Sequence, residues 1–235
     1  MPVLRVLSLI VLFLTVLTSC DDIWADDANG SVAEANTALV PQATGSCSGL
    51  VALRADAHDP IWLASYDPDL FDHAVRHYSS LARCGEGGAS FAPDAGLVEV
   101  ATAHSEDMRV HNFFDHTSVV AGKETLGKRL RLVGVTYRAA AENLALMSLF
   151  NFRPGEAFEL LDEDNCVFRD PESGELYRRR TYAELAKVLV DGWMASPGHR
   201  ANLLNDRYRR LGSGLSIDPD RDYCGSVYAT QNFAD

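Results

Sequence analysis

The sequence predicts an α+β domain in which helices pack on a small antiparallel sheet. Between positions 67 and 204, apolar residues recur at the spacing of amphipathic helices. In the last third of the chain they alternate instead with polar or small residues, which indicates strands. Helices followed by strands are typical of an α+β domain. A length of 235 residues suits one domain with appendages.

The helices are predicted from their start signals. The first is expected to begin at Asp67-Pro68 and the second at Pro93-Asp94, because Asp caps a helix and Pro fits its first turn. Thr181 and Glu184 have the spacing of a capping box. The remaining helices are expected over residues 125–133, 181–195 and 197–204.

Two strands joined by a turn are expected at the end of the chain. Residues 211–217 and 227–233 alternate in polarity, and Pro219-Asp220 marks the turn, so they predict an antiparallel hairpin. Residues 151–180 fit neither the helical nor the strand pattern. Their turn signals and short apolar pieces predict an inserted hairpin or lobe, which Cys166 could attach to the last strand.

The N-terminus is typical of an export signal. Arg5 precedes an apolar run over residues 6–17, which is too short to cross a membrane as a helix. Residues 17–20, Leu-Thr-Ser-Cys, resemble a bacterial lipobox, which implies removal of a signal peptide at 1–19 and lipid attachment at Cys20. An ordinary secretory signal cut near the same point is the alternative. We expect an exported, membrane-anchored lipoprotein that faces the periplasm or the cell exterior.

The charge distribution limits the partners. Residues 20–66 are expected to be an acidic tether and lead-in, because positions 21–53 hold five acids and no Lys or Arg. The domain itself then spans 67–235, with the insertion at about 151–180. The formal net charge of −12 argues against nucleic acid as a partner and against electrostatic docking on anionic lipid. Membrane attachment is therefore expected through the lipid anchor.

Four cysteines besides Cys20 are available for disulfides. An oxidising compartment favours pairing, and four cysteines allow three connectivities. Proximity in the chain favours Cys47–Cys84, which leaves Cys166–Cys224, and free thiols are the alternative. The absence of Cys-x-x-Cys spacing argues against a thiolate zinc site or a redox dithiol.

A set of short motifs follows in a fixed order. They are NFFDHTS at 112–118, AENLA at 141–145, WMASPGHRANLL at 193–204, LGSG at 211–214 and YATQNF at 228–233. In this order they resemble the CAP domain, the family of cysteine-rich secretory proteins, antigen 5 and pathogenesis-related 1 proteins, in its bacterial SCP-like branch. The resemblance covers about residues 69–235, apart from the insertion, and implies an α-β-α sandwich.

The resemblance also implies a cleft with two His and two acidic residues, which in some members binds a divalent metal through the His pair. His116 and His199 match the two His, and Glu142 matches the first acid. The second acid is expected three residues after Trp193, where this chain has Ser196. We therefore expect His116, Glu142, Ser196 and His199 to line a ligand site. His116 and His199 would be the ligands of any metal, such as Zn²⁺.

Three functions are compatible with these residues. We expect an envelope-anchored binding module whose cleft takes a lipid or another small molecule. The first alternative is an extracytoplasmic hydrolase that uses a metal or a general base at His116, Glu142 and His199. The second is an envelope scaffold or adhesion protein in which the His cluster is a structural brace. The acid missing at Ser196 counts against the hydrolase, so no residue is assigned as catalytic.

Several other residues are expected to be structural. His104 and His111 lie on the apolar stripe of the second helix and are expected in the core or at the cleft edge. Trp193 and Tyr228 are expected in the core. Ser196 is expected to close the turn before Pro197 rather than to act in a Ser-His-acid triad.

Overall fold

The computed structural model describes residues 47–63, 65–152, 157–163, 165–220 and 224–235. The predicted signal peptide, the lipidation site at Cys20 and the first part of the tether lie outside the described residues. Within the described part of the chain, no helix combines the length and hydrophobicity needed to cross a membrane.

The centre of the domain is a four-stranded sheet with strand order β1-β5-β6-β2. β5 pairs antiparallel with β6, and β6 pairs antiparallel with β2, whereas the short β1 runs parallel to β5. The strands are β1 (Ala92–Pro93), β2 (Ala140–Ser148), β5 (Arg210–Asp218) and β6 (Ser226–Ala234). The predicted C-terminal hairpin is confirmed, whereas β1 and β2 are strands that the sequence patterns did not predict.

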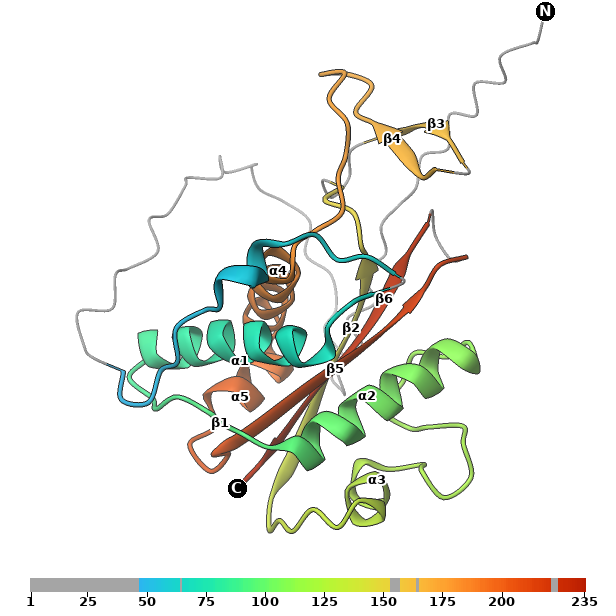
Figure 1. Ribbon diagram of the computed structural model, residues 1–235. Coiled ribbons are helices and arrows are strands. Elements are labelled where there is room, and N and C mark those ends of the chain that lie inside the picture. Colours follow the sequence, from blue (N-terminus) through green and yellow to red (C-terminus); the bar gives the residue numbers. More distant parts are fainter. Residues whose placement is uncertain (1–46, 64, 153–156, 164, 221–223) are drawn as a thin grey trace, which may run out of the picture.

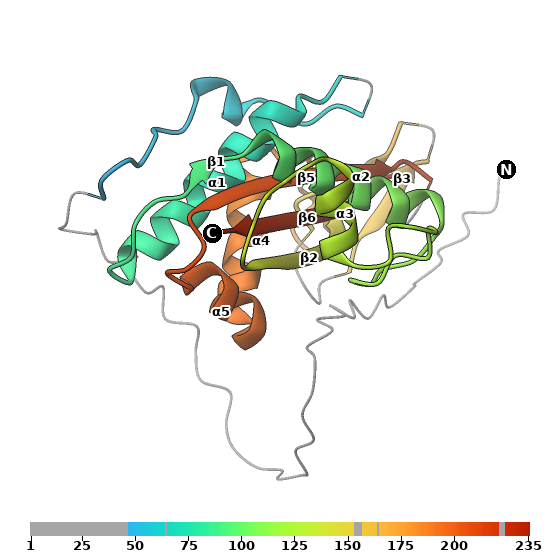
Figure 2. The same ribbon diagram turned by 90° about the horizontal axis from the view of Figure 1, so that it is seen from below.

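Helices cover both faces of the sheet, which gives the α-β-α sandwich that the motifs implied (Figures 1 and 2). On one face lie α2 (Ala95–Val110) and α3 (Leu126–Leu132). On the other face lie α1 (Pro68–Gly85), α4 (Tyr182–Ala195) and α5 (Pro197–Leu204). A short 3₁₀ helix, η1 (Ala55–His58), precedes α1. All five predicted helices are confirmed.

The helix starts have the local causes that the sequence suggested. The Asp67 carboxylate accepts the backbone N–H groups of Asp69 and Leu70 at 2.9 and 3.0 Å. Thr181 and Glu184 form the predicted capping box in both directions. Each bond satisfies a backbone donor that the first turn of a helix leaves without a partner.

The largest core lies between the sheet and the α1, α4 and α5 layer. Phe71, Trp193 and Phe233 are at most 1% exposed there. On the opposite face, α2 approaches β5 closely, because an added Cβ at Gly212 or Gly214 would lie within 2.6 Å of the helix backbone. A larger residue at either position would therefore clash with the backbone of α2.

The insertion forms a separate lobe at one end of the sheet (Figure 1). Its two-stranded sheet consists of β3 (Glu159–Asp162) and β4 (Val167–Arg169), as the predicted hairpin requires. Aromatic rings pack beneath it with centroids 4.6 to 5.6 Å apart, namely Phe150, Phe152, Phe158, Phe168 and Tyr177. These rings are continuous with the main hydrophobic core, so the lobe is anchored to the domain by apolar packing as well as by a disulfide.

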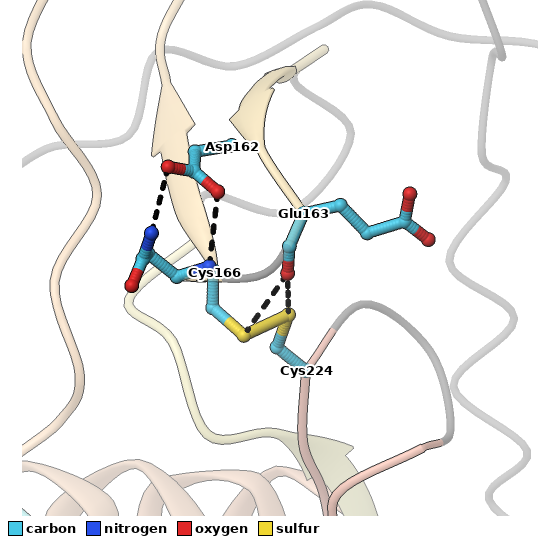
Figure 3. Close-up of a disulfide and its surroundings, with 5 residues drawn as sticks. Asp162, Glu163, Cys166 and Cys224 are labelled. Atoms are coloured by element: carbon cyan, nitrogen blue, oxygen red, sulfur yellow. Dashed lines mark hydrogen bonds between the residues drawn. A yellow bond between two sulfur atoms is a disulfide. The ribbon is translucent and has the colours of Figure 1, made fainter.

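Two disulfides have the favoured connectivity. Cys47–Cys84 joins the lead-in to the end of α1, and Cys166–Cys224 joins the lobe to the turn before β6. Figure 3 shows both sulfur atoms of the second disulfide beside the backbone carbonyl of Glu163. The prediction that Cys166 attaches the lobe to the last strand is confirmed at the turn that precedes this strand.

Candidate functional site

Glu142 is the centre of a buried polar cluster. Because side chains alternate along a strand, Glu142, Leu144 and Leu146 of β2 share one face of the sheet, where α2 and α3 pack. The Glu142 side chain is only 4% exposed. Its position on an edge strand next to β6 brings it close to groups from a loop, a helix and the neighbouring strand.

Both carboxylate oxygens of Glu142 are used. Oε1 accepts from His116 Nδ1 at 3.0 Å and from Arg129 Nη2 at 2.9 Å. Oε2 accepts from Arg129 Nη2 at 2.7 Å. With the Asn232 amide oriented to donate, its nitrogen lies 3.1 Å from Oε2 and its oxygen accepts the backbone N–H of Ala101 at 3.2 Å. The carboxylate is thus held by one cation, one imidazole and one amide.

Arg129 is a buried cation on α3. Its side chain is 3% exposed, and its Nη1 donates to the backbone carbonyls of His116 and Lys123 at 3.1 and 3.0 Å. The guanidinium therefore holds the loop over residues 111–125 against β2 while it neutralises Glu142. A planar guanidinium suits this arrangement, because its donors fan out in fixed directions.

His116 is the exposed member of the cluster. It lies in the loop over residues 111–125, and 37% of its side chain is exposed. The bond from its Nδ1 to the ionised Glu142 places a proton on Nδ1 and fixes the ring orientation. In the neutral ring, Nε2 is then the acceptor. A carboxylate that orients a ring in this way also raises the basicity of the other nitrogen.

His199 approaches from the other side of β2. It lies on α5, and Asn143 Nδ2 donates to its backbone carbonyl at 3.3 Å, while Asn202 donates to Asn143 Oδ1 at 2.9 Å. His199 is 8% exposed, and its Nδ1 has no hydrogen-bond partner among the described residues. Asn143 thus ties α5 to the strand that carries Glu142.

Burial governs the ionisation of these groups. It lowers the pKa of His199, and a protonated His116 would lower it further, so the two rings are close enough to interact. Burial opposes ionisation of Glu142, yet the His116 hydrogen bond and the charges of His104 and Arg129 hold its pKa below the usual value. The site at neutral pH therefore contains an ionised carboxylate matched by the guanidinium.

His104 completes the surroundings of Glu142. It is fully buried on α2, with Nε2 3.1 Å from the carbonyl oxygen of Asp115 and 3.8 Å from Glu142 Oε1. Burial lowers its pKa, and its predicted place in the core is confirmed. The same prediction for His111 is wrong, because α2 ends at Val110 and His111 is an exposed C-cap residue.

Ser196 lies between α4 and α5 and is 6% exposed. Its N–H donates to the Trp193 carbonyl at 3.2 Å, and its own carbonyl accepts from Arg200 N at 2.8 Å. Its hydroxyl forms no capping bond to α5. The backbone of Ser196 therefore closes the turn as expected, whereas its ligand-binding role stays a prediction.

Apolar side chains continue from the polar cluster along β2. Met108, Leu144 and Tyr228 are buried together, and Phe113 and Leu146 are partly buried against them. Phe113 lies in the same loop as His116, and its ring centroid is 6.0 Å from that of His104, so this apolar surface borders the polar cluster. This neighbourhood could accept a molecule with one polar end and one apolar end.

The donors do not fit a tightly held metal ion. Catalytic zinc sites use three protein ligands, and structural sites use four. Among the described residues, no three His, Cys, Asp or Glu side chains are grouped so as to hold an ion. With the Glu142 oxygens occupied, the two imidazoles of His116 and His199 remain. This His pair stays a prediction that a metal titration must test.

The sequence motifs predicted His116, Glu142 and His199 as site residues, but they did not predict Arg129 and Asn232. Arg129 lies in a predicted amphipathic helix next to other basic residues, so it has the pattern of a solvent-facing cation. Asn232 belongs to the YATQNF motif, and its position on the strand that pairs with β2 is the signal that could have found it.

Comparison with known proteins identifies the family. Residues 82–233, more than half of the chain, match the model of the cysteine-rich secretory protein family, CAP. The uncharacterized membrane protein YlbC of Bacillus subtilis is 32% identical over 155 residues, which are 66% of this chain and 32% of that protein. The uncharacterized protein YkwD of Bacillus subtilis is 26% identical over 144 residues, 61% of this chain and 42% of that protein. The chain thus spans less than half the length of these relatives.

A solved structure is also similar. It is that of an extracellular protein containing an SCP domain from Bacillus anthracis, with 25% identity and a TM-score of 0.48. The match covers 71% of this chain and 41% of that one. The family assignment rests on the match over residues 82–233, which includes the strands, loop and helices that carry His116, Glu142 and His199. This chain belongs to the cysteine-rich secretory protein (CAP) family.

Proposed function

We propose that the chain is an exported, membrane-anchored binding module whose site at His116 and His199 takes a small ligand with an O–H or N–H donor. The observation that carries this proposal is the ring of His116, which is 37% exposed and is oriented through Nδ1 by Glu142, so that Nε2 of the neutral ring can accept from a ligand. His199 supports it, because its buried Nδ1 has no partner among the described residues. A buried polar atom without a partner is costly, so a polar group that reached it would be stabilising.

The apolar surface beside the polar cluster supports an amphipathic ligand. Phe113 and Leu146 are only partly buried, and Leu146 lies on the same face of β2 as Glu142, which bonds His116. A ligand whose polar end bonds His116 could place an apolar segment on these side chains. Such burial contributes roughly 25 cal/mol for each Å² of apolar surface removed from water.

Export and anchoring are supported by the chemistry of the chain. Two disulfides are typical of proteins that fold in an oxidising compartment. The Leu-Thr-Ser-Cys segment at 17–20 offers Cys20 for lipid attachment. One relative from Bacillus subtilis is named a membrane protein. Mass spectrometry of the N-terminal peptide, with and without an acyl mass on Cys20, tests the anchor.

The binding proposal is tested with two matched probes. Monopalmitoylglycerol carries hydroxyl donors, whereas methyl palmitate has the same acyl chain and no donor. We expect the purified chain to bind the first at least about 10-fold tighter, the effect of one good hydrogen bond. The variant His116→Ala should remove this preference, and His111→Ala, which changes an exposed ring in the same loop, should keep it.

Equal binding of the two probes, or a preference that survives His116→Ala, would contradict the donor-binding proposal. Circular dichroism of each variant shows that the fold is intact. Failure of both probes to bind, together with an empty site in native mass spectrometry, would favour the scaffold function instead.

A hydrolase is the second candidate, and the orientation of His116 is the observation that favours it. A ring held by a carboxylate with Nε2 free is the arrangement of a general base. Hydrolysis of p-nitrophenyl butyrate that falls at least about 100-fold in His116→Ala and is unchanged in His111→Ala would support it. An equal rate in the two variants would exclude His116 as the base.

A further inference from the structure

We propose that Arg129 is the resident cation of this site and occupies the place on Glu142 that a divalent metal would need. The proposal concerns how the site is held together and is independent of the ligand that His116 and His199 bind. It assigns Arg129 as a positioning residue, since its guanidinium contacts Glu142 and the loop that carries His116.

The carboxylate of Glu142 is saturated with hydrogen-bond donors. Two carboxylate oxygens offer about four acceptor positions. His116, Arg129 and Asn232 make four contacts of 2.7 to 3.1 Å with Glu142, two on each oxygen. His104 at 3.8 Å is too far to add a hydrogen bond. An incoming metal ion would have to displace one of these donors.

Charge also opposes a metal ion at Glu142. Arg129 is 3% exposed and Glu142 is 4% exposed, so the two charges are poorly screened by water and neutralise each other. A divalent ion bound to Glu142 would lie beside the guanidinium and be repelled by it. The residue that the family resemblance predicts at the position of the second acid, Ser196, is uncharged.

Arg129 is also fixed from both sides. Nη2 forms two bonds with Glu142, while Nη1 donates to the carbonyls of His116 and Lys123. A guanidinium with this many bonds does not swing away to admit an ion. Movement of Arg129 would also release the loop that positions His116, so metal binding would disturb the site rather than complete it.

The test is a zinc titration of the full purified chain and three variants. Arg129→Met removes the cation with little change in length, Arg129→Lys keeps the charge, and Glu142→Gln removes the carboxylate. Zn²⁺ is added after dialysis against chelator, and binding is followed by calorimetry and elemental analysis. We expect no stoichiometric zinc at micromolar concentration in the wild type, Arg129→Lys or Glu142→Gln.

The expected gain appears in Arg129→Met, which should bind Zn²⁺ at least about 10-fold tighter than the wild type, the scale of groups that adjust a metal site. Zinc should raise the melting temperature of this variant and not that of Arg129→Met/Glu142→Gln. One zinc per wild-type chain, lost in Glu142→Gln, would overturn the proposal, as would a folded Arg129→Met with unchanged affinity. If Arg129→Met does not fold, the zinc content of the wild type decides. One zinc per chain overturns the proposal, and no bound zinc supports it.

Discussion

The Arg129–Glu142 pair should be strongly coupled in a double-mutant cycle. The cycle compares the free energies of unfolding of the wild type, Arg129→Met, Glu142→Gln and the double variant. Each single change leaves one charge buried without its partner, because the two side chains are 3% and 4% exposed. The double change leaves neither charge, and the amide introduced by Glu142→Gln keeps one acceptor oxygen, for the donor of either His116 or Asn232.

The magnitude follows from burial. Breaking one partner of a buried pair costs about 3 to 5 kcal/mol, whereas replacing both partners by neutral groups can be close to neutral. Arg129→Met should lie near the upper end, since it also frees the carbonyls of His116 and Lys123. Glu142→Gln should lie near the lower end, because the guanidinium keeps those carbonyls. We expect a coupling energy of about 3 kcal/mol.

Urea denaturation at pH 7.5 measures the cycle, with the fluorescence of the buried Trp193 as the signal. A matched control is the exposed Lys187–Asp191 pair on α4, whose side chains are 51% and 62% exposed. Its cycle should give about 0.5 kcal/mol or less. A coupling at Arg129–Glu142 no larger than that of the control would refute the argument that the buried pair organises this site.

Three further predictions concern the scaffold. Burial raises the pKa of Asp72 from 3.8 to about 6, so its ionisation costs stability as the pH rises through this range. In urea denaturation from pH 4 to 8, Asp72→Asn should therefore gain about 3 kcal/mol of stability relative to the wild type. A difference between the two proteins that does not change with pH would contradict this cause. Gly214→Ala should lose about 3 kcal/mol or more, because its Cβ would meet α2 backbone at 2.2 Å. In contrast, Gly192→Ala, with nothing within 4 Å, should be neutral or stabilising by thermal melting. Replacing Cys166 and Cys224 by Ser should cost up to about 4 kcal/mol for a separation of 58 residues, and no loss in non-reducing urea melts would show that this disulfide does not constrain the unfolded chain.

The helices were predictable because their signals are local. Asp67 caps α1 through atoms two and three residues away, and Thr181 and Glu184 cap each other within one turn. The apolar stripe of each helix is also visible within a short window of sequence. The C-terminal hairpin has the same property, because β5 and β6 are joined by a turn and alternate in polarity.

The strand β2 was not predicted because its pairing is not local. Ala140–Ser148 pairs with β6, about 80 to 90 residues further along the chain. Its sequence AAENLALMS has no regular alternation of polar and apolar residues, and it contains good helix formers. The position of Glu142 beside Asn232 follows from this register. Local sequence patterns therefore could not predict the contact between these two residues.

The change at Ser196 and the presence of Arg129 have one electrostatic consequence. A site with two neutral His and two ionised acids carries a charge of −2, which a divalent ion would balance. In this chain Arg129 is bonded to Glu142, so these two charges sum to zero, and the motif comparison predicts the uncharged Ser196 at the position of the second acid. A carboxylate that is already neutralised has little electrostatic demand for a metal. The charge balance therefore favours a neutral hydrogen-bond donor over a cation as the ligand. Arg129→Met removes the positive charge and should shift this preference towards a cation.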